Sequence, residues 1–423
     1  MPYTLEEVAP DMLTGDGAAD AGNRWTLNFG PQHPATHTTL RLVLELDGER
    51  VLKCTPHIGY LHSGFEKLME TLNYNQNVTI VDRMDYSGPT YNELAWFAAV
   101  EKLMGIELTP RCKALRTIAG ELARILSHLL TVSASGLDLG AMTAFLYAFN
   151  EREPIYDIVE LMSGQRYHTA WCRVGGLNMD LPDEALFKKL VHQLIDDRLP
   201  NSIADLEKLL NKNRIFLDRT RGVGAISHDD AIAWGLSGPM ARASGVRRDL
   251  RKDEPYLCFK DNWDGAGAKA VQFQVPVMET GDVLARYLIR IEEIKQSCEI
   301  IRQLIDNLPK GPVNVSPEGK EVLPPKDQVY SSIEGLIQHF ELIMTNRGFE
   351  APKGEVYGAI ETANGELGYT IVSAGENRPF RVRTRPCSFI NYSCYGKLIE
   401  GHTISETVAV LGSINVIAAE LDR

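Results

Sequence analysis

Apolar and polar residues alternate near both ends of the chain in a pattern typical of β-hairpins. Leucines occupy every second position from residue 40 to residue 46, and a short run returns after a turn. Dipeptides that end in glycine mark the turns, because glycine accepts the positive φ angles of tight hairpins. We predict hairpins over residues 40–54, with the turn at Asp47-Gly48, and over 356–372, with the turn at Asn364-Gly365; a further strand is predicted over 380–385.

Between these ends, apolar residues recur at the spacing of amphipathic helices. The helix starts and stops are marked by Thr109-Pro110, Pro200, Pro309 and Gly105. Helices are predicted over residues 92–105, 110–130, 155–162, 184–199, 200–210, 282–308, 331–345 and 404–421. The pattern predicts an α+β protein with a helical body and small N- and C-terminal β-sheets.

The chain of 423 residues is longer than a single core usually allows, and we expect several packed subdomains. We predict an extended tail over 1–24, a β subdomain over 25–60, a helical body over 61–345 and a C-terminal segment over 346–423. The tail is acidic and has no apolar run, so it does not look like a secretory signal. No apolar stretch approaches the ~18 residues typical of a membrane span.

Composition narrows the classes of partner. The formal net charge of -12 argues against binding to nucleic acids or anionic membranes, and residues 247–252 are interpreted as a solvated charged face. The seven cysteines are scattered without a Cys-x-x-Cys pair. Their distribution favours a reducing compartment and argues against a disulfide framework, a zinc ribbon or a self-contained iron–sulfur site.

The loop at residues 30–37 (Gly-Pro-Gln-His-Pro-Ala-Thr-His) is the first candidate for chemistry. Its glycine and prolines exclude a regular helix or central strand, so His33 and His37 lie on a stiff connection beside a sheet. The pair could present an imidazole to a ligand, or could be hydrogen-bonded structural residues. No further ligands at metal-site spacing are nearby, and no metal site is predicted.

Tyr86, Asp138 and His168 are further candidates because each lies in a polar or glycine-flanked segment. Each also has a structural explanation: a surface phenol, a helix cap and an interface histidine. Residues 221–227 contain Gly-x-Gly without the third glycine of a dinucleotide-binding loop, so a helix-entry turn is predicted there. The sequence contains no phosphate loop and no nucleophile elbow.

Taken together, several segments resemble the 49 kDa (D) subunit family of respiratory complex I, the bacterial NADH-quinone oxidoreductase. The resemblance runs from about Trp25 to Arg423, and its motifs lie at residues 30–37, 82–86, 138–143, 234–239, 242–245 and 420–423. This family is similar to the large subunits of nickel–iron hydrogenases, which implies a hydrogenase large-subunit-like fold. A hydrogenase itself is excluded, because the corresponding segments 83–88 and 412–417 lack the cysteine thiolates that would bind nickel.

The resemblance implies roles for individual residues. Tyr86 and His37 would hydrogen-bond the two carbonyls of a quinone headgroup, and His37 could deliver a proton. Asp138 would pair with His37 and hold it oriented, and His33 would line the same loop. Arg83 and His168 would lie near the partner's [4Fe-4S] cluster and raise its potential. Many relatives carry arginine where this chain has Ser63, so one positive charge near that cluster is absent.

The implied function is that of the quinone-site subunit of a proton-translocating NADH-quinone oxidoreductase. Electrons from NADH would arrive through FMN and iron–sulfur clusters in partner subunits, and this chain would bind quinone but no FMN, NAD or cluster. The implied partners are the cluster-bearing B subunit, the C subunit and the membrane-embedded H subunit at the quinone entrance, in the peripheral arm on the cytoplasmic side of the bacterial inner membrane. A non-catalytic scaffold subunit of a ferredoxin-driven relative stays open as the alternative, as does the choice between ubiquinone and menaquinone.

Overall fold

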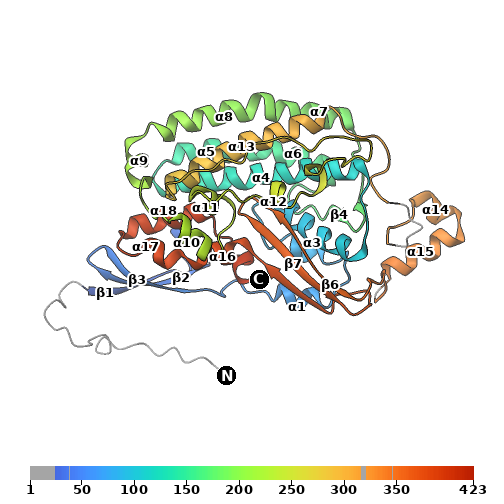
Figure 1. The fold of residues 1–423 in the computed structure, drawn as a ribbon, viewed down its shortest axis with the longest axis horizontal. Helices are drawn as coiled ribbons and strands as arrows, with labels where there is room; N and C mark the ends of the chain where they lie inside the picture. The colour runs from blue at the N-terminus through green and yellow to red at the C-terminus, as the bar shows by residue number, and fades with distance from the viewer. Residues whose placement is uncertain (1–23, 38, 316–320, 345) are drawn as a thin grey trace, which may run out of the picture.

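The computed structural model describes residues 24–37, 39–315, 321–344 and 346–423, so nearly all of the tail predicted over 1–24 lies outside the described residues. Long helices form one layer of the molecule, and two small sheets lie along the opposite side (Figure 1). None of the helices in these ranges is both long enough and apolar enough to cross a membrane.

Two long helices form the centre of the body. Helix α4 (Pro110–Asp138) packs against α13 (Val283–Ile305), with α3 (Pro89–Met104) beside α4. The start predicted for α4 is confirmed, because the Thr109 hydroxyl accepts a hydrogen bond from the backbone of Cys112 at 3.3 Å. The helix runs beyond the predicted end at residue 130, and its last turn carries Asp138.

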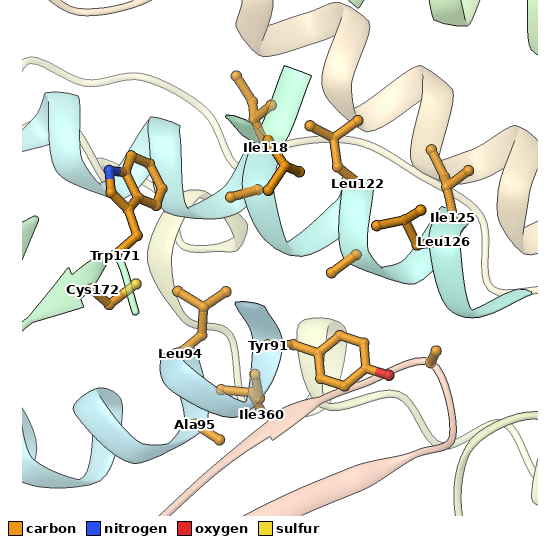
Figure 2. Close-up of a cluster of buried hydrophobic side chains, with 14 of the residues drawn as sticks. Tyr91, Leu94, Ala95, Ile118, Leu122, Ile125, Leu126, Trp171, Cys172 and Ile360 are labelled. Carbon is orange, nitrogen blue, oxygen red and sulfur yellow. The ribbon is translucent and has the colours of Figure 1, made fainter. Parts of the chain in front are cut away.

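The main core lies between α3, α4 and the C-terminal sheet. Figure 2 shows Leu94 from α3 beneath Ile118 and Leu122 from α4, with Trp171 at one side and Ile360 from the sheet below. These five side chains are at most 4% exposed. Burial of each large apolar side chain contributes roughly 1.5–3 kcal/mol, so this contact fixes the sheet against the helical layer.

The N-terminal hairpin is confirmed and extends to three antiparallel strands. Strands β1 (Arg24–Phe29), β2 (Arg41–Asp47) and β3 (Arg50–His57) lie in that order, and the alternate leucines of β2 are fully buried. Asp47 pairs with Arg50, so the two loop residues are Gly48 and Glu49. The turn therefore lies one residue later than predicted.

The C-terminal hairpin is confirmed as well. Strands β6 (Gly354–Glu361), β7 (Glu366–Ser373) and β8 (Arg381–Arg385) form an antiparallel sheet in sequence order. The loop between Glu361 and Glu366 contains the predicted Asn364-Gly365 turn. One face of the sheet packs on α3, and the other face lines a groove described below.

Besides the end of α4, two further predicted helix boundaries are wrong. Pro200 does not restart a helix, because α7 (Glu184–His192), α8 (Leu199–Leu206) and two π-helical segments, η3 (Gln193–Arg198) and η4 (Glu207–Asn211), follow one another without a break. A π-turn widens the helix and accommodates a proline that lacks an N–H group. The predicted helix over 404–421 is two helices, α18 (Ile404–Ile414) and α19 (Ala418–Asp422), divided at Asn415 in the left-handed conformation (φ 58°).

The interpretation of residues 247–252 as a solvated face is also wrong in part. Arg251 is 2% exposed and pairs with Asp249 at 2.8 Å and with Glu121 of α4 at 3.1 Å. The arginine is buried because both carboxylates and their hydrogen bonds compensate its charge. Arg247, Arg248 and Lys252 are exposed as predicted.

Other predictions are confirmed or shifted by a few residues. Helix α13 has Asp282 as its N-cap, Ser227 caps α10 at the predicted helix-entry turn, and α15 begins after Ser332. The predicted helix over 331–345 includes Thr345, which lies outside the described residues. The remaining elements are η2 (Pro34–Thr36), α1 (Phe65–Met69), α2 (Val78–Val81), α5 (Met142–Asn150), α6 (Arg152–Ser163), β4 (Cys172–Arg173), β5 (Gly176–Leu177), α9 (Arg214–Thr220), α10 (His228–Ala233), α11 (Gly238–Ala243), α12 (Leu250–Asp253), η5 (Leu257–Phe259), α14 (Lys326–Ser331), α15 (Ile333–Ile343), α16 (Cys387–Ser393) and α17 (Tyr395–Ile399).

Candidate functional site

The histidine-bearing loop connects β1 to β2 and contains the single turn η2. Gly30 has a φ of 93°, and a side chain there would lie 2.0 Å from the carbonyl oxygen of Leu40, so only glycine lets the loop close against the strand. His33 caps the turn: its Nδ1 accepts a hydrogen bond from the backbone of Ala35 at 3.1 Å, and its ring contacts Phe29. One ring nitrogen of His33 therefore has a structural role.

His37 ends the same turn and reaches a residue from the other side of the fold. Its Nε2 lies 2.7 Å from Oδ1 of Asp138, the last residue of α4. The His37 side chain is 26% exposed, whereas that of Asp138 is 7% exposed. The structure thus brings these two predicted site residues together, with an imidazole that is anchored on one side and open on the other.

The close approach of α18 to Asp138 depends on a glycine in that helix. A Cβ atom at Gly412 would lie 2.7 Å from Oδ2 of Asp138, well inside normal contact. This Oδ2 atom is buried and has no hydrogen-bond partner among the described residues. Helix α18 also packs against η2, the turn that His37 ends, so the same helix contacts the elements that carry both members of the pair.

Tyr86 lies between α2 and α3 and is half-buried. Its backbone carbonyl accepts a hydrogen bond from the Tyr167 hydroxyl. Within the described ranges, its own hydroxyl has no hydrogen-bond partner. Burial, reinforced by the Asp85 carboxylate, raises the pKa of Tyr86 above its ordinary value. The phenol therefore stays protonated at neutral pH and is available as a hydrogen-bond donor.

Two asparagine side chains, Asn364 and Asn415, join the Tyr86 segment to α18. Nδ2 of Asn364 donates to Oδ2 of Asp85 at 3.2 Å, and Oδ1 of Asn364 accepts from Nδ2 of Asn415 at 2.8 Å. Asn415 follows the last turn of α18, three residues after Gly412. These hydrogen bonds connect the Tyr86 segment, through Asp85, to the end of α18, the helix in which Gly412 lies beside Asp138.

Arg83 and His168 also lie near each other. Burial, and secondly the Arg83 guanidinium, lowers the pKa of His168. Nδ1 of His168 is buried and has no partner among the described residues. Arg83 is exposed and donates to the carbonyl of Thr79 at 2.7 Å. This pair therefore presents one fixed cation and one neutral imidazole.

Two buried carboxyls that the sequence analysis missed hold the His168 segment in place. Asp82 accepts from the backbone of Ala170 at 2.9 Å, and Glu93 accepts from the backbones of Trp171 and Cys172. Burial raises the pKa of both carboxyls. Asp82 lies in the 82–86 motif, where no role was predicted for it. Nothing in the sequence marks Glu93, because it lies within the apolar pattern of α3.

Asn364 and Asn415 were missed as well. The local pattern marks Asn364 as a turn residue and places Asn415 inside a helix, and their hydrogen bond crosses 51 positions of the chain. Across the described ranges, no group of three or more His, Cys, Asp or Glu side chains is placed to hold a metal ion. The arrangement offers hydrogen-bond donors and one partly exposed imidazole, that of His37.

Comparisons with known proteins give a consistent result. The family described as "Respiratory-chain NADH dehydrogenase, 49 Kd subunit" matches residues 138–423. The D subunit of the NADH-quinone oxidoreductase of Geotalea uraniireducens (strain Rf4) is 47% identical over 398 residues, covering 94% of this chain and 98% of the relative. The D 2 subunit of the same enzyme in Rhizobium etli (strain CIAT 652) is 48% identical, covering 94% and 95%.

A third relative matches the chain along its whole length. The D 1 subunit of the NADH-quinone oxidoreductase of Chloroherpeton thalassium (strain ATCC 35110 / GB-78) is 45% identical over 421 residues, covering 100% of this chain and 92% of the relative. Identity of this size over nearly complete chains, together with the family match, confirms the resemblance in the sequence motifs. The chain therefore belongs to the 49 kDa (D) subunit family and is a subunit of an NADH-quinone oxidoreductase, the respiratory complex I.

Proposed function

We propose that this chain forms the quinone-headgroup site of the oxidoreductase and protonates the reduced quinone. The observation that carries the proposal is the 2.7 Å contact between Nε2 of His37 and Oδ1 of Asp138, which leaves the imidazole partly exposed. The hydroxyl of Tyr86, which has no hydrogen-bond partner among the described residues, supplies a second donor. The site is built from chain segments that α18 and the Asp85–Asn364–Asn415 hydrogen bonds hold together.

The proposed chemistry follows from what the two side chains can donate. Reduction of a quinone places negative charge on its two carbonyl oxygens. As an imidazolium, His37 donates through Nε2 to Asp138 and through Nδ1 to one carbonyl oxygen, and the Nδ1 proton passes to the oxyanion as it forms. Tyr86 donates its hydroxyl to the other carbonyl oxygen. Donors fixed before the reaction stabilise developing charge without reorganisation.

The proposal includes the partners. The partner's [4Fe-4S] cluster supplies the electrons when it is bound beside this chain. Arg83 and His168 face that cluster in the proposal, where a cation and a hydrogen-bond donor favour its reduced state. We place the cluster in the B subunit, with the C and H subunits as further neighbours, in the peripheral arm on the cytoplasmic side of the membrane. Protonation at His37 would then couple to proton translocation in the membrane subunits.

The proposal also includes the hydrogenase-like cavity. Segments 83–88 and 412–417 correspond to the two nickel-binding segments of that fold, and here they are joined through Asn364. Amide and carboxyl side chains take the places of thiolates, which suits an organic headgroup better than a soft metal ion. No NAD, FMN or cluster is assigned to this chain.

The test is Tyr86→Phe in membranes that contain the assembled complex. This change removes one hydroxyl and little volume. We expect NADH oxidation with ubiquinone or menaquinone analogues to fall at least roughly tenfold, because a donor to the developing oxyanion is lost. NADH oxidation with an artificial acceptor that draws electrons upstream should be unchanged, and a native gel should show the assembled complex.

Tyr330→Phe is the matched control. It removes the same hydroxyl group at a residue of α14 that is 89% exposed and lies away from the site. Unchanged quinone activity in assembled Tyr86→Phe complex would refute the headgroup role and favour a scaffold. The two quinone analogues, tested side by side, also show which headgroup the site accepts.

A further inference from the structure

The outer face of the C-terminal sheet carries a row of arginines. Arg381, Arg383 and Arg385 alternate along β8 with Val382 and Thr384, which are buried on the opposite face. The three arginines line a groove of about 540 Å³ together with Arg423, with Thr370 and Val372 of β7 among the other lining residues. On a chain with a net charge of -12, this concentration of arginine is a local exception.

Carboxylates beside the groove pair with three of its four arginines. Arg381 lies 2.9 Å from Glu70 and 3.6 Å from Glu66, Arg423 lies 3.5 Å from Glu66, and Arg385 lies 3.6 Å from Glu366. The side chains of Glu70 and Glu366 are 11% and 9% exposed, whereas those of Arg381 and Arg385 are 50% and 27% exposed, so these two arginines are more accessible than the acids that pair with them. Arg383, between these two arginines, is exposed and has no ion-pair partner in the described part of the chain.

The far end of the groove is closed by an aromatic contact. The guanidinium of Arg423 lies over the ring of Phe389 at 4.5 Å, and both residues line the groove with Pro386. Glu355 of β6 lies at the opposite side and is exposed. The result is a concave surface with fixed walls rather than a flat cationic patch.

We propose that this arginine groove binds an extended, carboxylate-rich segment of another subunit of the oxidoreductase. The inference rests on the membership of the chain in a multisubunit complex and is independent of the quinone site. Alternate residues of a strand repeat at about 6.7 Å, so acidic side chains at every second position of an extended segment match the three arginines. Guanidinium forks bind carboxylates through two parallel hydrogen bonds. A flat bilayer cannot follow a concave floor.

The test places a photo-crosslinking residue in the groove of the intact complex. Glu355→p-benzoylphenylalanine leaves all four arginines in place. After irradiation of the purified complex, mass spectrometry identifies the peptide attached at position 355. We expect a peptide from another subunit that carries Asp or Glu at two or more alternating positions. The same replacement at Glu376, an exposed residue after β7, is the matched control and should not yield this peptide.

Charge reversal then tests the role of Arg383. Combined with the crosslinker at position 355, Arg383→Glu should lower the yield of the acidic cross-link roughly tenfold, because an attraction becomes a repulsion. Arg378→Glu, which changes an exposed arginine of the neighbouring loop, should leave the yield unchanged. An unchanged yield with Arg383→Glu would refute the proposal.

Other occupants of the groove give distinct results. Cross-links to lipid, to residues 1–23 of this chain, or to a peptide without alternating acids would each overturn the proposal, as would the absence of any product above the control. Because the first experiment keeps every arginine, its result does not depend on whether Arg383→Glu assembles. Quinone activity is not the readout, so failure here leaves the quinone-site proposal untouched.

Discussion

His37 and Asp138 lie 101 residues apart in sequence and form one hydrogen-bonded group in the structure. If the His37 imidazole can donate to quinone only while the Asp138 carboxylate orients it, replacement of either residue removes most of the quinone-reducing activity. We expect Asp138→Asn and His37→Gln each to lower quinone reduction at least roughly tenfold. The double variant should lose little more than the more severe single variant, because contacting residues are not additive.

The unmodified protein, the two single variants and the double variant form a double-mutant cycle. For each, the rates of NADH oxidation with quinone and with the artificial acceptor are measured in membranes that contain the assembled complex. The upstream rate serves as the internal control for each variant. Fully multiplicative losses would mean that His37 and Asp138 act separately, and the orienting role of Asp138 would be abandoned.

Gly412 lies so close to Asp138 that any larger residue at this position would contact the carboxylate. A Cβ atom would lie 2.7 Å from the carboxylate, so Gly412→Ala must move one of them. Displacement of about 1 Å can cost as much as ~100-fold in rate, and we expect quinone reduction to fall roughly tenfold or more. Alanine is the better helix former by about 1 kcal/mol, so loss of helix stability cannot explain such a result.

Gly396→Ala in α17 is the matched control. A Cβ atom there would lie 3.6 Å from the nearest carbonyl oxygen, which is ordinary contact. Quinone and artificial-acceptor rates of both variants give the comparison. Equal quinone rates for the two variants would show that the approach of Gly412 to Asp138 has no part in the chemistry.

At the scale of elements, the local signals in the sequence predicted much of the fold. Hairpin turns and helix starts depend on neighbouring residues, so the Thr109 cap, the start of α13 and both hairpins could be predicted. The helix boundary predicted at Pro200 was wrong, because a π-turn accommodates a proline that normally ends a helix. The division of the last predicted helix at Asn415 was missed because its amide bonds a distant asparagine, Asn364.

The candidate site was predictable to a different degree. The resemblance to the family pointed to His37, Tyr86 and Asp138 as one group, and the structure places His37 against Asp138. The supports of the site could not be predicted in the same way. Gly412 matters only because two helices approach closely, and Glu93 only because a distant loop folds over α3. Such contacts depend on tertiary packing, which no local pattern contains.

The cap of α13 is an element whose contribution can be measured. Asp282 is buried and accepts from the backbones of Ala285 and Gly222, both at 2.8 Å. Asp282→Ala removes both hydrogen bonds and leaves the buried N–H group of Ala285 without a partner, and we expect a loss of about 1–3 kcal/mol in the free energy of unfolding. Urea unfolding of the purified chain measures the loss.

The cap of α7 provides the comparison. Asp183 makes one exposed bond of this kind, to the backbone of Leu186 at 2.9 Å. Asp183→Ala should cost less, about 0.5–1 kcal/mol. If both variants lost the same free energy, the bond to Gly222 would contribute nothing, and the cap would not help to join α13 to the loop between α9 and α10.

At the scale of the molecule, buried charges connect the layers. Glu293 of α13 accepts from Arg242 of α11 at 2.9 Å and lies 2.7 Å from Nε2 of His128 on α4. Arg242 also donates to Glu361 of β6 at 2.7 Å. If one of these side chains is removed, the charges of the others stay buried without a partner, in surroundings that solvate charge poorly. The network therefore specifies how the helices and the sheet fit together.

The buried carboxyl of Glu420 should make the stability of the whole fold depend on pH. Its carboxyl accepts from the backbone of Cys387 at 2.6 Å and from the Ser388 hydroxyl at 2.5 Å. Burial, and secondly the Asp85 carboxylate, raises the pKa of Glu420 from its ordinary 4.5 to about 7. Between these values the folded protein keeps a proton that the unfolded chain releases, so stability falls as pH rises and levels off above pH 7.

Glu420→Gln is neutral at every pH and does not release this proton. We therefore expect its Tm to rise relative to that of the unmodified protein as pH increases from 5 to 8, when both purified chains are melted in parallel. Burial lowers the pKa of His128 to about 4, so this residue contributes stability that is lost as pH falls below 6.5. That contribution is common to both proteins and cancels in the difference. Melting curves that shift in parallel would show that Glu420 is already ionised in the fold at pH 5, and the buried proton between the C-terminal helix and the Tyr86 segment would have to be given up.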